Sequence, residues 1–256
     1  MQNIRIDHRP PLAWVTLDRP DKRNAVTSDM WLALPGIASE LAATRSVRVA
    51  LICGAGTEAF SAGADIAEMQ QNLAHPERMR VMQQAVLDGQ RAWQRLPIPT
   101  IAVIHGACTG GGCGLALACD LRLAAAGSFF AIPPARLGLV YGLDDTRRLV
   151  DLVGPARAKE ILFTGRRVSA AEALELGLVN EVVPTAELEA RAIELANTIA
   201  RNAANSIAVA KQIVNLIMDG TRVETAATRQ LFDDAFNSPE FAEGARAFIE
   251  KRPPEF

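Results

Sequence analysis

The apolar positions in the first part of the chain switch between the period of a strand and that of a helix. Residues 3–8 and 13–18 alternate apolar and polar side chains, with Arg9-Pro10-Pro11 between them. This pattern predicts a short antiparallel pair of strands. Over residues 28–44 the apolar side chains instead recur at the spacing of an amphipathic helix. They are Trp31, Leu34, Ile37 and Leu41.

Short apolar runs of strand length then alternate with helical segments. Strands are predicted at 47–53, 100–105 and 121–126. Helices are predicted at 77–96 and within 110–119, the second beginning inside a run of glycines. Strands that alternate with helices in this way predict an α/β core with largely parallel pairing.

Helical signals dominate from Pro155 onward. Ser169 and Glu172 have the spacing of a capping box, and Gly177 is placed to end that helix. A last strand is predicted at 179–183, followed by helices at 186–200, 207–218, 224–236 and 239–251. We therefore divide the chain into an α/β core, residues 1–195, and a helical C-terminal region, residues 196–256.

Composition and charge narrow the classes of function. The 256 residues are 49% hydrophobic and 22% charged, with a net charge of −2, as in an ordinary globular protein. This charge gives no reason to expect nucleic acid or an anionic membrane as the main partner. No apolar run approaches the length needed to span a bilayer, and the first residues carry none that could serve as a signal peptide. We therefore expect a cytoplasmic protein. We also expect no metal site, because the four cysteines form no C-x-x-C pair.

Two glycine-rich stretches, 61–65 and 110–114, carry the strongest chemical signal. Each follows a predicted strand, and the second also opens a helix. The run Gly110-Gly111-Gly112-Cys113-Gly114 is not a dinucleotide-binding fingerprint, because Leu115 follows it, and it is not a Walker loop. The chain also has no G-x-S-x-G elbow of a serine hydrolase.

Unpaired amides at such loops can bind an anionic oxygen. The first amides of a helix point outward and carry partial positive charge, and glycines allow close approach. One amide from each stretch could converge on one oxygen, and a single such donor stabilises a transition state by about 3 kcal/mol. The alternative is that these glycines only permit close packing of helix on strand.

The chain resembles the crotonase superfamily, also called the enoyl-CoA hydratase/isomerase family, through motifs that run in order over nearly its whole length. They are residues 19–25 (RPDKRNA), 60–66 (FSAGADI), 105–113 (HGACTGGGC), 118–121 (ACDL), 153–158 (VGPARA), 162–165 (LFTG), 171–173 (AEA), 177–179 (GLV) and 248–252 (FIEKR). The resemblance implies an α/β spiral of ββα repeats. It also implies a helical C-terminus that forms trimers, often paired as a dimer of trimers.

The same resemblance implies a coenzyme A thioester as substrate, with no cofactor besides. Its enolate oxygen would be bound by the backbone amides of Ala64 and Gly111. The phosphates of coenzyme A would lie near Lys22 and Arg23. The remaining residues implied to contact it are Ala62, Asp65 and Ile66 through their backbone, and Phe248 and Lys251 from the helical region.

The chain departs from this family's hydratases at both catalytic glutamates. The first follows the Gly-Gly-Gly-Cys run, where Gly114 stands, and the second aligns with Pro134. Neither residue can transfer a proton. The chain therefore resembles an atypical member.

Residues that could take over the role of the two missing glutamates follow Gly138. Tyr141 is the only tyrosine and could donate a proton, although its ordinary pKa near 10 makes it a poor base. Asp144 or Asp145 could act as base if its pKa were raised. The alternative for both aspartates is a structural role in the first turn of the following helix.

We interpret the chain as an acyl-CoA enzyme resembling enoyl-CoA hydratase/isomerase. Two alternatives remain open. One is a decarboxylase of a malonyl-type acyl-CoA, which forms the enolate without a general base. The other is a non-catalytic acyl-CoA-binding pseudoenzyme. A third class, an RNA-binding member, is not favoured by the charge balance.

Overall fold

The computed structural model describes residues 3–256, so Met1 and Gln2 of the predicted core lie outside the described residues. The chain starts with an antiparallel pair, β1 (Ile4–Arg9) and β2 (Leu12–Leu17), as predicted. A 3-10 turn at Pro20–Lys22 leads to α1 (Ser28–Ala43), which begins after the cap residue Thr27. The side chains predicted to line one face of this helix are all buried.

The strands of the described residues, β1 and β2 included, form two sheets. The six-stranded sheet has the order β1-β2-β3-β5-β7-β10, and the four-stranded sheet has the order β4-β6-β8-β9. The six-stranded sheet is completed by β3 (Val49–Gly54), β5 (Thr100–Ile104), β7 (Leu121–Ala125) and β10 (Glu181–Val183). The four-stranded sheet consists of β4 (Ala59–Ser61), β6 (Ala107–Thr109), β8 (Phe129–Ala131) and β9 (Arg167–Ser169).

Three ββα units connect the sheets and confirm the predicted spiral. Each unit gives one strand to each sheet, in the pairs β3/β4, β5/β6 and β7/β8, and the successive strands are parallel. The units continue into α2 (Ile66–Asn72) with α3 (Pro76–Gln94), into α4 (Gly111–Leu117), and into α5 (Leu143–Thr164). Because the carboxyl ends of neighbouring parallel strands meet at one edge, the loops after β4 and β6 lie side by side.

Two apolar clusters hold the core. The larger one lies between the sheets and α1, α3, α4 and α5, and the smaller one lies between the six-stranded sheet and α7 (Leu188–Ala200). Helix α7 buries Leu188, Ala192, Ala196 and Ala200, one residue each turn, against the sheet. A short α6 (Ala170–Glu175) and two 3-10 turns (Pro134–Leu137 and Thr185–Glu187) complete the core.

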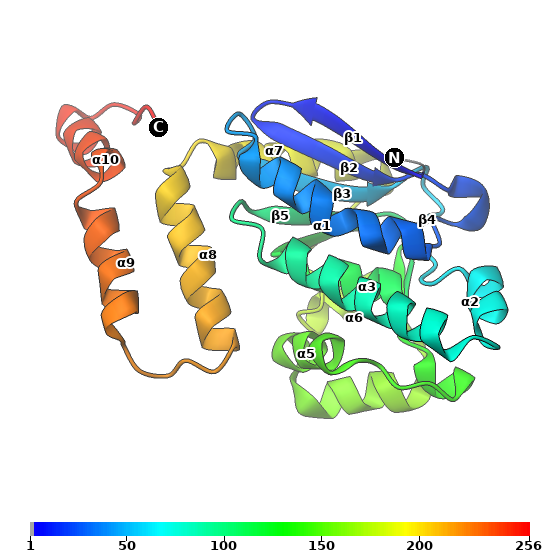
Figure 1. The fold of residues 1–256 in the computed structure, drawn as a ribbon. Coiled ribbons are helices and arrows are strands. Elements are labelled where there is room, and N and C mark those ends of the chain that lie inside the picture. Colours follow the sequence, from blue (N-terminus) through cyan, green and yellow to red (C-terminus); the bar gives the residue numbers. More distant parts are fainter. Residues whose placement is uncertain (1–2) are drawn as a thin grey trace.

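Helix α8 (Ala204–Met218) contacts the core, whereas α9 (Ala226–Phe236) and α10 (Pro239–Glu250) lie farther from it (Figure 1). The predicted boundary after residue 195 lies inside α7, and the chain leaves the core only after Ala200. The division into two regions therefore remains a prediction. No helix within residues 3–256 is long and apolar enough to cross a membrane.

Candidate functional site

The two glycine-rich stretches meet at the ends of β4 and β6. A Cβ atom on Gly63 would lie 2.8 Å from the carbonyl oxygen of Thr109 and 3.3 Å from the amide nitrogen of Gly111. Gly63 also has φ +94, which favours glycine. The Thr109 hydroxyl donates a hydrogen bond to the carbonyl oxygen of Ala62 at 2.7 Å. The two loops are therefore in direct contact, as the sequence predicted.

The amides of Ala64 and Gly111 are close together and free. The Ala64 nitrogen lies 4.0 Å from the position of a Cβ on Gly111, the first residue of α4. The backbone of Val26 binds both neighbours of Ala64. Its amide donates to the Gly63 carbonyl oxygen at 2.8 Å, and its carbonyl oxygen accepts from the Asp65 amide at 3.3 Å. No hydrogen bond within residues 3–256 uses the amide of Ala64 or Gly111. Both N–H groups are therefore left without a partner in the part of the chain that the structure describes.

The loop that contains Lys22 and Arg23 is fastened to the first glycine-rich stretch. The buried Asn24 amide donates to the carbonyl oxygens of Ala55 at 3.0 Å and Ala59 at 2.7 Å. The Arg23 carbonyl oxygen accepts from the Ala62 amide at 2.9 Å. The side chains of Lys22 and Arg23 are exposed beside this contact, where they could meet an anionic ligand.

The Asp65 side chain serves the fold rather than a ligand. It caps α2 by accepting from the amides of Ala67 and Glu68, and it forms an ion pair of 2.8 Å with Arg19. Burial raises the pKa of this carboxyl, but Arg19 and the two amides outweigh burial and hold the pKa below its usual value. Of this residue, only the backbone is left for the predicted contact with coenzyme A.

Tyr141 reaches the second loop. Its hydroxyl donates to the Gly110 carbonyl oxygen at 3.3 Å. Burial, with a smaller contribution from the Asp145 carboxylate, holds the pKa of Tyr141 well above its usual value. The tyrosine is therefore protonated at neutral pH, so it can donate a hydrogen bond or a proton but cannot act as a base.

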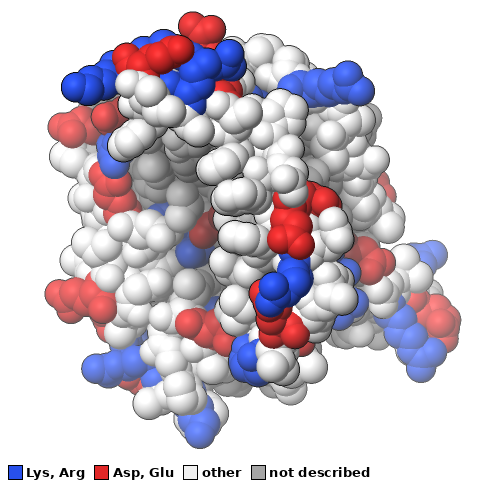
Figure 2. Space-filling view, turned by 90° about the vertical axis from the view of Figure 1, so that its left-hand side faces the viewer, with Lys and Arg blue, Asp and Glu red and all other residues white. Residues whose placement is uncertain are grey.

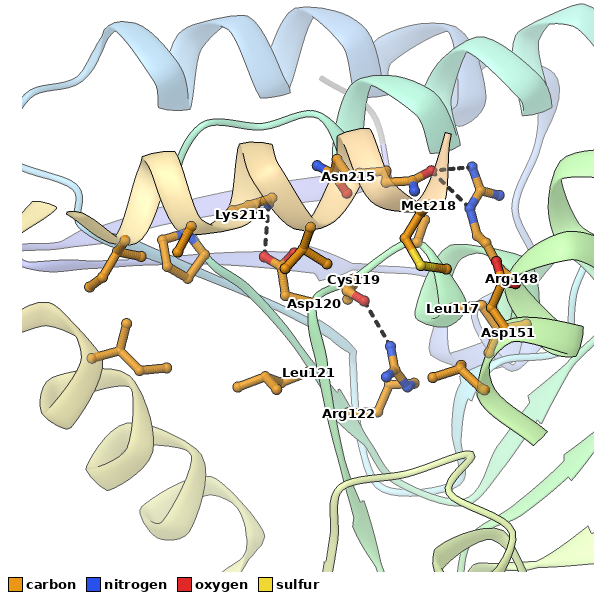
Figure 3. A pocket seen from close by; sticks show the side chains of 18 of the residues that line it. Leu117, Cys119, Asp120, Leu121, Arg122, Arg148, Asp151, Lys211, Asn215 and Met218 are labelled. Carbon is orange, nitrogen blue, oxygen red and sulfur yellow. Dashed lines mark hydrogen bonds and ion pairs between the residues drawn. The ribbon is translucent and has the colours of Figure 1, made fainter. Parts of the chain in front are cut away.

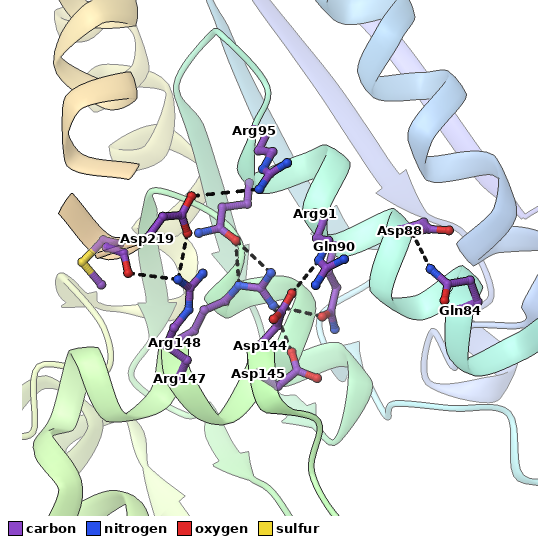
Figure 4. A network of polar contacts seen from close by, with 12 residues as sticks. Gln84, Asp88, Gln90, Arg91, Arg95, Asp144, Asp145, Arg147, Arg148 and Asp219 are labelled. Carbon is purple, nitrogen blue, oxygen red and sulfur yellow. Dashed lines mark hydrogen bonds and ion pairs between the residues drawn. The ribbon is translucent and has the colours of Figure 1, made fainter. Parts of the chain in front are cut away.

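The two aspartates in the first turn of α5 have opposite environments (Figure 4). Asp144 pairs with Arg91 at 2.7 Å, and this hydrogen bond lowers the pKa of Asp144. Asp145 is only 9% exposed, and burial raises its pKa to about 6 although Arg148 lies 3.2 Å away. A carboxylate whose pKa is raised towards neutrality can exchange protons with a substrate. Of the two aspartates, only Asp145 has its pKa raised.

The Asp145 carboxylate lies where a side chain at position 114 would begin. A Cβ on Gly114 would be 2.6 Å from Asp145 Oδ1. Two further residues lie at this place, the buried Gln90 and Arg148, and no sequence motif marks them. They are single polar residues in long helices, α3 and α5, and only the packing of these helices around α4 brings them together. Pro134 stands in the 3-10 turn that follows β8.

Comparisons with known proteins identify the family of this chain. The sequence model of the family described as enoyl-CoA hydratase/isomerase matches residues 8–256. The chain belongs to this family. It is 34% identical to a short-chain-enoyl-CoA hydratase of Clostridium acetobutylicum, over 98% of this chain and 96% of that protein. It is 33% identical to a crotonyl-CoA hydratase of Syntrophomonas wolfei, over 100% and 98% of the two chains.

Solved structures give the same result. The enoyl-CoA hydratase of Bacillus anthracis superimposes with a TM-score of 0.90 at 35% identity, covering 100% of this chain and 99% of that chain. The crotonase fold and the membership predicted from the motifs are thereby confirmed. The protein is an enoyl-CoA hydratase/isomerase-like enzyme of acyl-CoA metabolism.

Two residues that the family resemblance implied for coenzyme A lie elsewhere in the chain. Phe248 and Lys251 stand in and just after α10, on the side of the molecule opposite α2 (Figure 1). The Phe248 side chain is 86% exposed. Within one chain they do not join the group around Ala64 and Gly111.

A cavity of about 600 Å³ lies under α8, and its lining includes neither Ala64 nor Gly111 (Figure 3). Its polar centre is the ion pair between Lys211 and Asp120, 2.7 Å long, and Asp120 also accepts from the Thr100 amide at 2.7 Å. This cluster fastens the first C-terminal helix to the six-stranded sheet. Its groups are satisfied within the protein, unlike the two free amides.

Proposed function

We propose that this enzyme binds an acyl-CoA with its thioester oxygen between the amides of Ala64 and Gly111 and forms the enolate there. The observation that carries the proposal is the pair of free, adjacent N–H groups at the ends of two parallel strands. Such donors are rigid before the substrate arrives, so they stabilise charge that develops on the oxygen without reorganising.

Asp145 is the acid/base group of the proposed reaction. Its carboxylate takes a proton from the substrate carbon, and the electron pair of the C–H bond becomes the enolate, whose negative charge rests on the thioester oxygen. Return of the proton at a different carbon moves a double bond. In a hydration, Asp145 takes a proton from water as the water oxygen bonds to the β-carbon, the electron pair of the C=C bond becomes the enolate, and the proton returns to the α-carbon; a dehydration is the reverse of these steps. A pKa of about 6 suits both directions at neutral pH.

An apolar rim next to the amides supports an acyl substrate. Ile66 stands two residues after Ala64 and is 72% exposed, and Val140, next to Tyr141, is 92% exposed. Leu139 on the same loop and Leu143 at the start of α5 are exposed as well. Large apolar side chains that face solvent around a polar site are typical of a surface that an acyl chain or pantetheine arm covers.

The coenzyme A contacts proposed for Lys22 and Arg23 lie in one chain, whereas Phe248 and Lys251 require a second copy. A homotrimer, alone or as a dimer of trimers, would supply that copy. The C-terminal helices expose Phe232, Phe236, Phe241 and Ile249. Figure 2 shows this side of the molecule, where uncharged surface is interrupted near the middle by a column of acidic and basic side chains. Sedimentation of the full chain measures the assembly.

The test is exchange at carbon in deuterated water. The protein is incubated with saturated, 2-enoyl, 3-enoyl and malonyl-type CoA thioesters, and the mass of each is followed. We expect deuterium at the α-carbon of at least one thioester, because enolate formation precedes every product. Loss of carbon dioxide from the malonyl-type thioester alone would favour the decarboxylase. Binding without exchange or turnover across the panel would leave only the pseudoenzyme.

Tyr141→Phe should lower the rate of exchange by about three- to tenfold. The Tyr141 hydroxyl donates to the Gly110 carbonyl, and the N–H of that same peptide group belongs to Gly111. Hydrogen bonds in series polarise one another, so loss of a bond of about 1 kcal/mol weakens the Gly111 donor. The infrared carbonyl band of a bound, unreactive acyl-CoA should move towards its frequency in water. A loss beyond a hundredfold would instead make Tyr141 the proton donor.

A further inference from the structure

Position 114, in the middle of α4, requires glycine because neighbouring side chains leave no room for a Cβ atom, and not because of its backbone angles. Its φ is not positive, so any residue could adopt its backbone angles. Glycine is unfavourable inside a helix compared with alanine. A Cβ at this position would lie 2.4 Å from Gln90 Nε2 and 2.6 Å from Asp145 Oδ1, distances that real Cβ atoms do not show. Two polar side chains, one from α3 and one from α5, fill the place of a side chain here.

Neither of these side chains can move away easily, because Arg148 holds both. Arg148 Nη1 donates to Gln90 Oε1 at 3.0 Å and to Asp145 Oδ1 at 3.2 Å. The same guanidinium is fixed by Gln94, whose Oε1 accepts from Nε at 3.0 Å and from Nη2 at 2.8 Å. Gln90 and Arg148 are 1% and 5% exposed. The cluster is therefore rigid and lies almost wholly out of solvent.

The arginine also decides which way the Gln90 amide faces. Because Oε1 accepts from Arg148, the Nε2 group must face Gly114 and the Asp145 carboxylate. Gln90 Nε2 is buried and makes no hydrogen bond of ordinary geometry within residues 3–256, so it acts on the Asp145 carboxylate only through their longer contact beside Gly114. A buried donor without a partner is unfavourable for folding, and such groups are rare. This donor faces the one carboxylate of the cluster.

The position along α4 connects the cluster to the free amides. Gly114 lies three residues after Gly111, and residues three apart are neighbours on one face of a helix. The Gly114 amide donates to the Gly110 carbonyl oxygen at 3.1 Å, the oxygen that also accepts from Tyr141. Asp145 is thus within one helical turn of the proposed oxyanion site.

We propose that Gln90 is the positioning residue for Asp145, and that Gly114 leaves the space in which these two side chains meet. The inference rests on the proposed function, since it assigns Gln90 to the acid/base group of that reaction. The acid/base carboxylate of this enzyme then approaches from α5, and a side chain on α4 at position 114 excludes it. A glutamate introduced by Gly114→Glu would displace Asp145 rather than restore a two-glutamate site.

The groups facing Asp145 determine how it titrates. Burial raises the pKa of its carboxyl most, Arg148 and the Gln90 amide lower it, and Asp144, itself paired with Arg91, raises it. Tyr141 remains neutral over the relevant range. Loss of the amide donor removes one contribution that favours the charged carboxylate, so the pKa should rise.

The experiment compares Gln90→Leu with Gln84→Leu, an exposed glutamine on the same helix. The titration midpoint of Asp145 is read without substrate, from the infrared band of the protonated carboxyl that disappears in Asp145→Asn. We expect Gln90→Leu to raise the midpoint by about half to one pH unit and to move the acid limb of the exchange rate equally. The Gln84→Leu midpoint should equal that of the wild type.

Gly114→Ala tests the space itself without changing Gln90. It should move the midpoint and lower the exchange rate at least tenfold, whereas Gly127→Ala should change neither, because a Cβ there meets no atom within 4 Å. An unchanged midpoint in both Gln90→Leu and Gly114→Ala would overturn the inference. A shifted midpoint in an enzyme that exchanges no acyl-CoA would reject the proposed function and retain the positioning role.

Discussion

Gly111→Pro should lower the rate of α-carbon exchange by about two to three orders of magnitude, because it removes one of the two proposed oxyanion donors. The position suits the test. Gly111 is the first residue of α4, where proline is well tolerated and the amide has no partner within the helix. The added Cβ would lie 3.4 Å from Trp31, an ordinary contact. The rate is measured with the thioester of the panel that exchanges fastest.

Gly111→Ala is the matched control. It adds the same Cβ but keeps the amide, so it should retain most of the exchange that the proline removes. Circular dichroism and thermal unfolding of both variants show whether the α4 turn is preserved. Wild-type rates in folded Gly111→Pro would refute the placement of the oxygen at this amide.

The elements of this fold could be predicted because burial follows periodicity. Trp31, Leu34, Ile37 and Leu41 recur at helical spacing, and all four are buried in α1. The predicted strands lie within one or two residues of β3, β5 and β7. The periodicity of residues 186–200 predicted the helix α7 but not that its alanines pack on the sheet. The predicted boundary after residue 195 lies inside this helix.

The candidate site also has one part that could be predicted from the sequence and one that could not. The two glycine-rich stretches could be recognised because a backbone donor depends on local features, namely a strand end, glycines and a helix start. The choice of Ala64 and Gly111 within them came from the family resemblance and stays a prediction. The environment of Asp145 was not predictable, because it depends on side chains from α3 and α5 that meet beside α4. Nothing in the sequence distinguishes Asp144 from Asp145, although one pairs with Arg91 at the surface and the other is buried against Gly114.

Asp145→Asn should lower the exchange rate by about two to four orders of magnitude. The variant keeps the size of the side chain and removes its capacity to take a proton. Asp144→Asn is the matched control on the same helical turn. Its carboxylate is already committed to Arg91, and the low pKa of Asp144 prevents it from binding a proton near neutrality, so the rate should change less than threefold. Equal losses in the two variants would contradict the assignment.

The dependence on pH separates a base from a merely structural carboxylate. A base must be deprotonated, so the exchange rate of the wild type should rise with pH through about 6, the pKa to which burial raises Asp145. One pH unit below that midpoint, about a tenth of the carboxylate is charged, and the rate should be about tenfold below its plateau. The residual exchange of Asp145→Asn should lack this rise. A wild-type profile that is flat between pH 5 and 7 would exclude Asp145 as the base, and the proton acceptor would then have to come from the substrate or from a second copy of the chain.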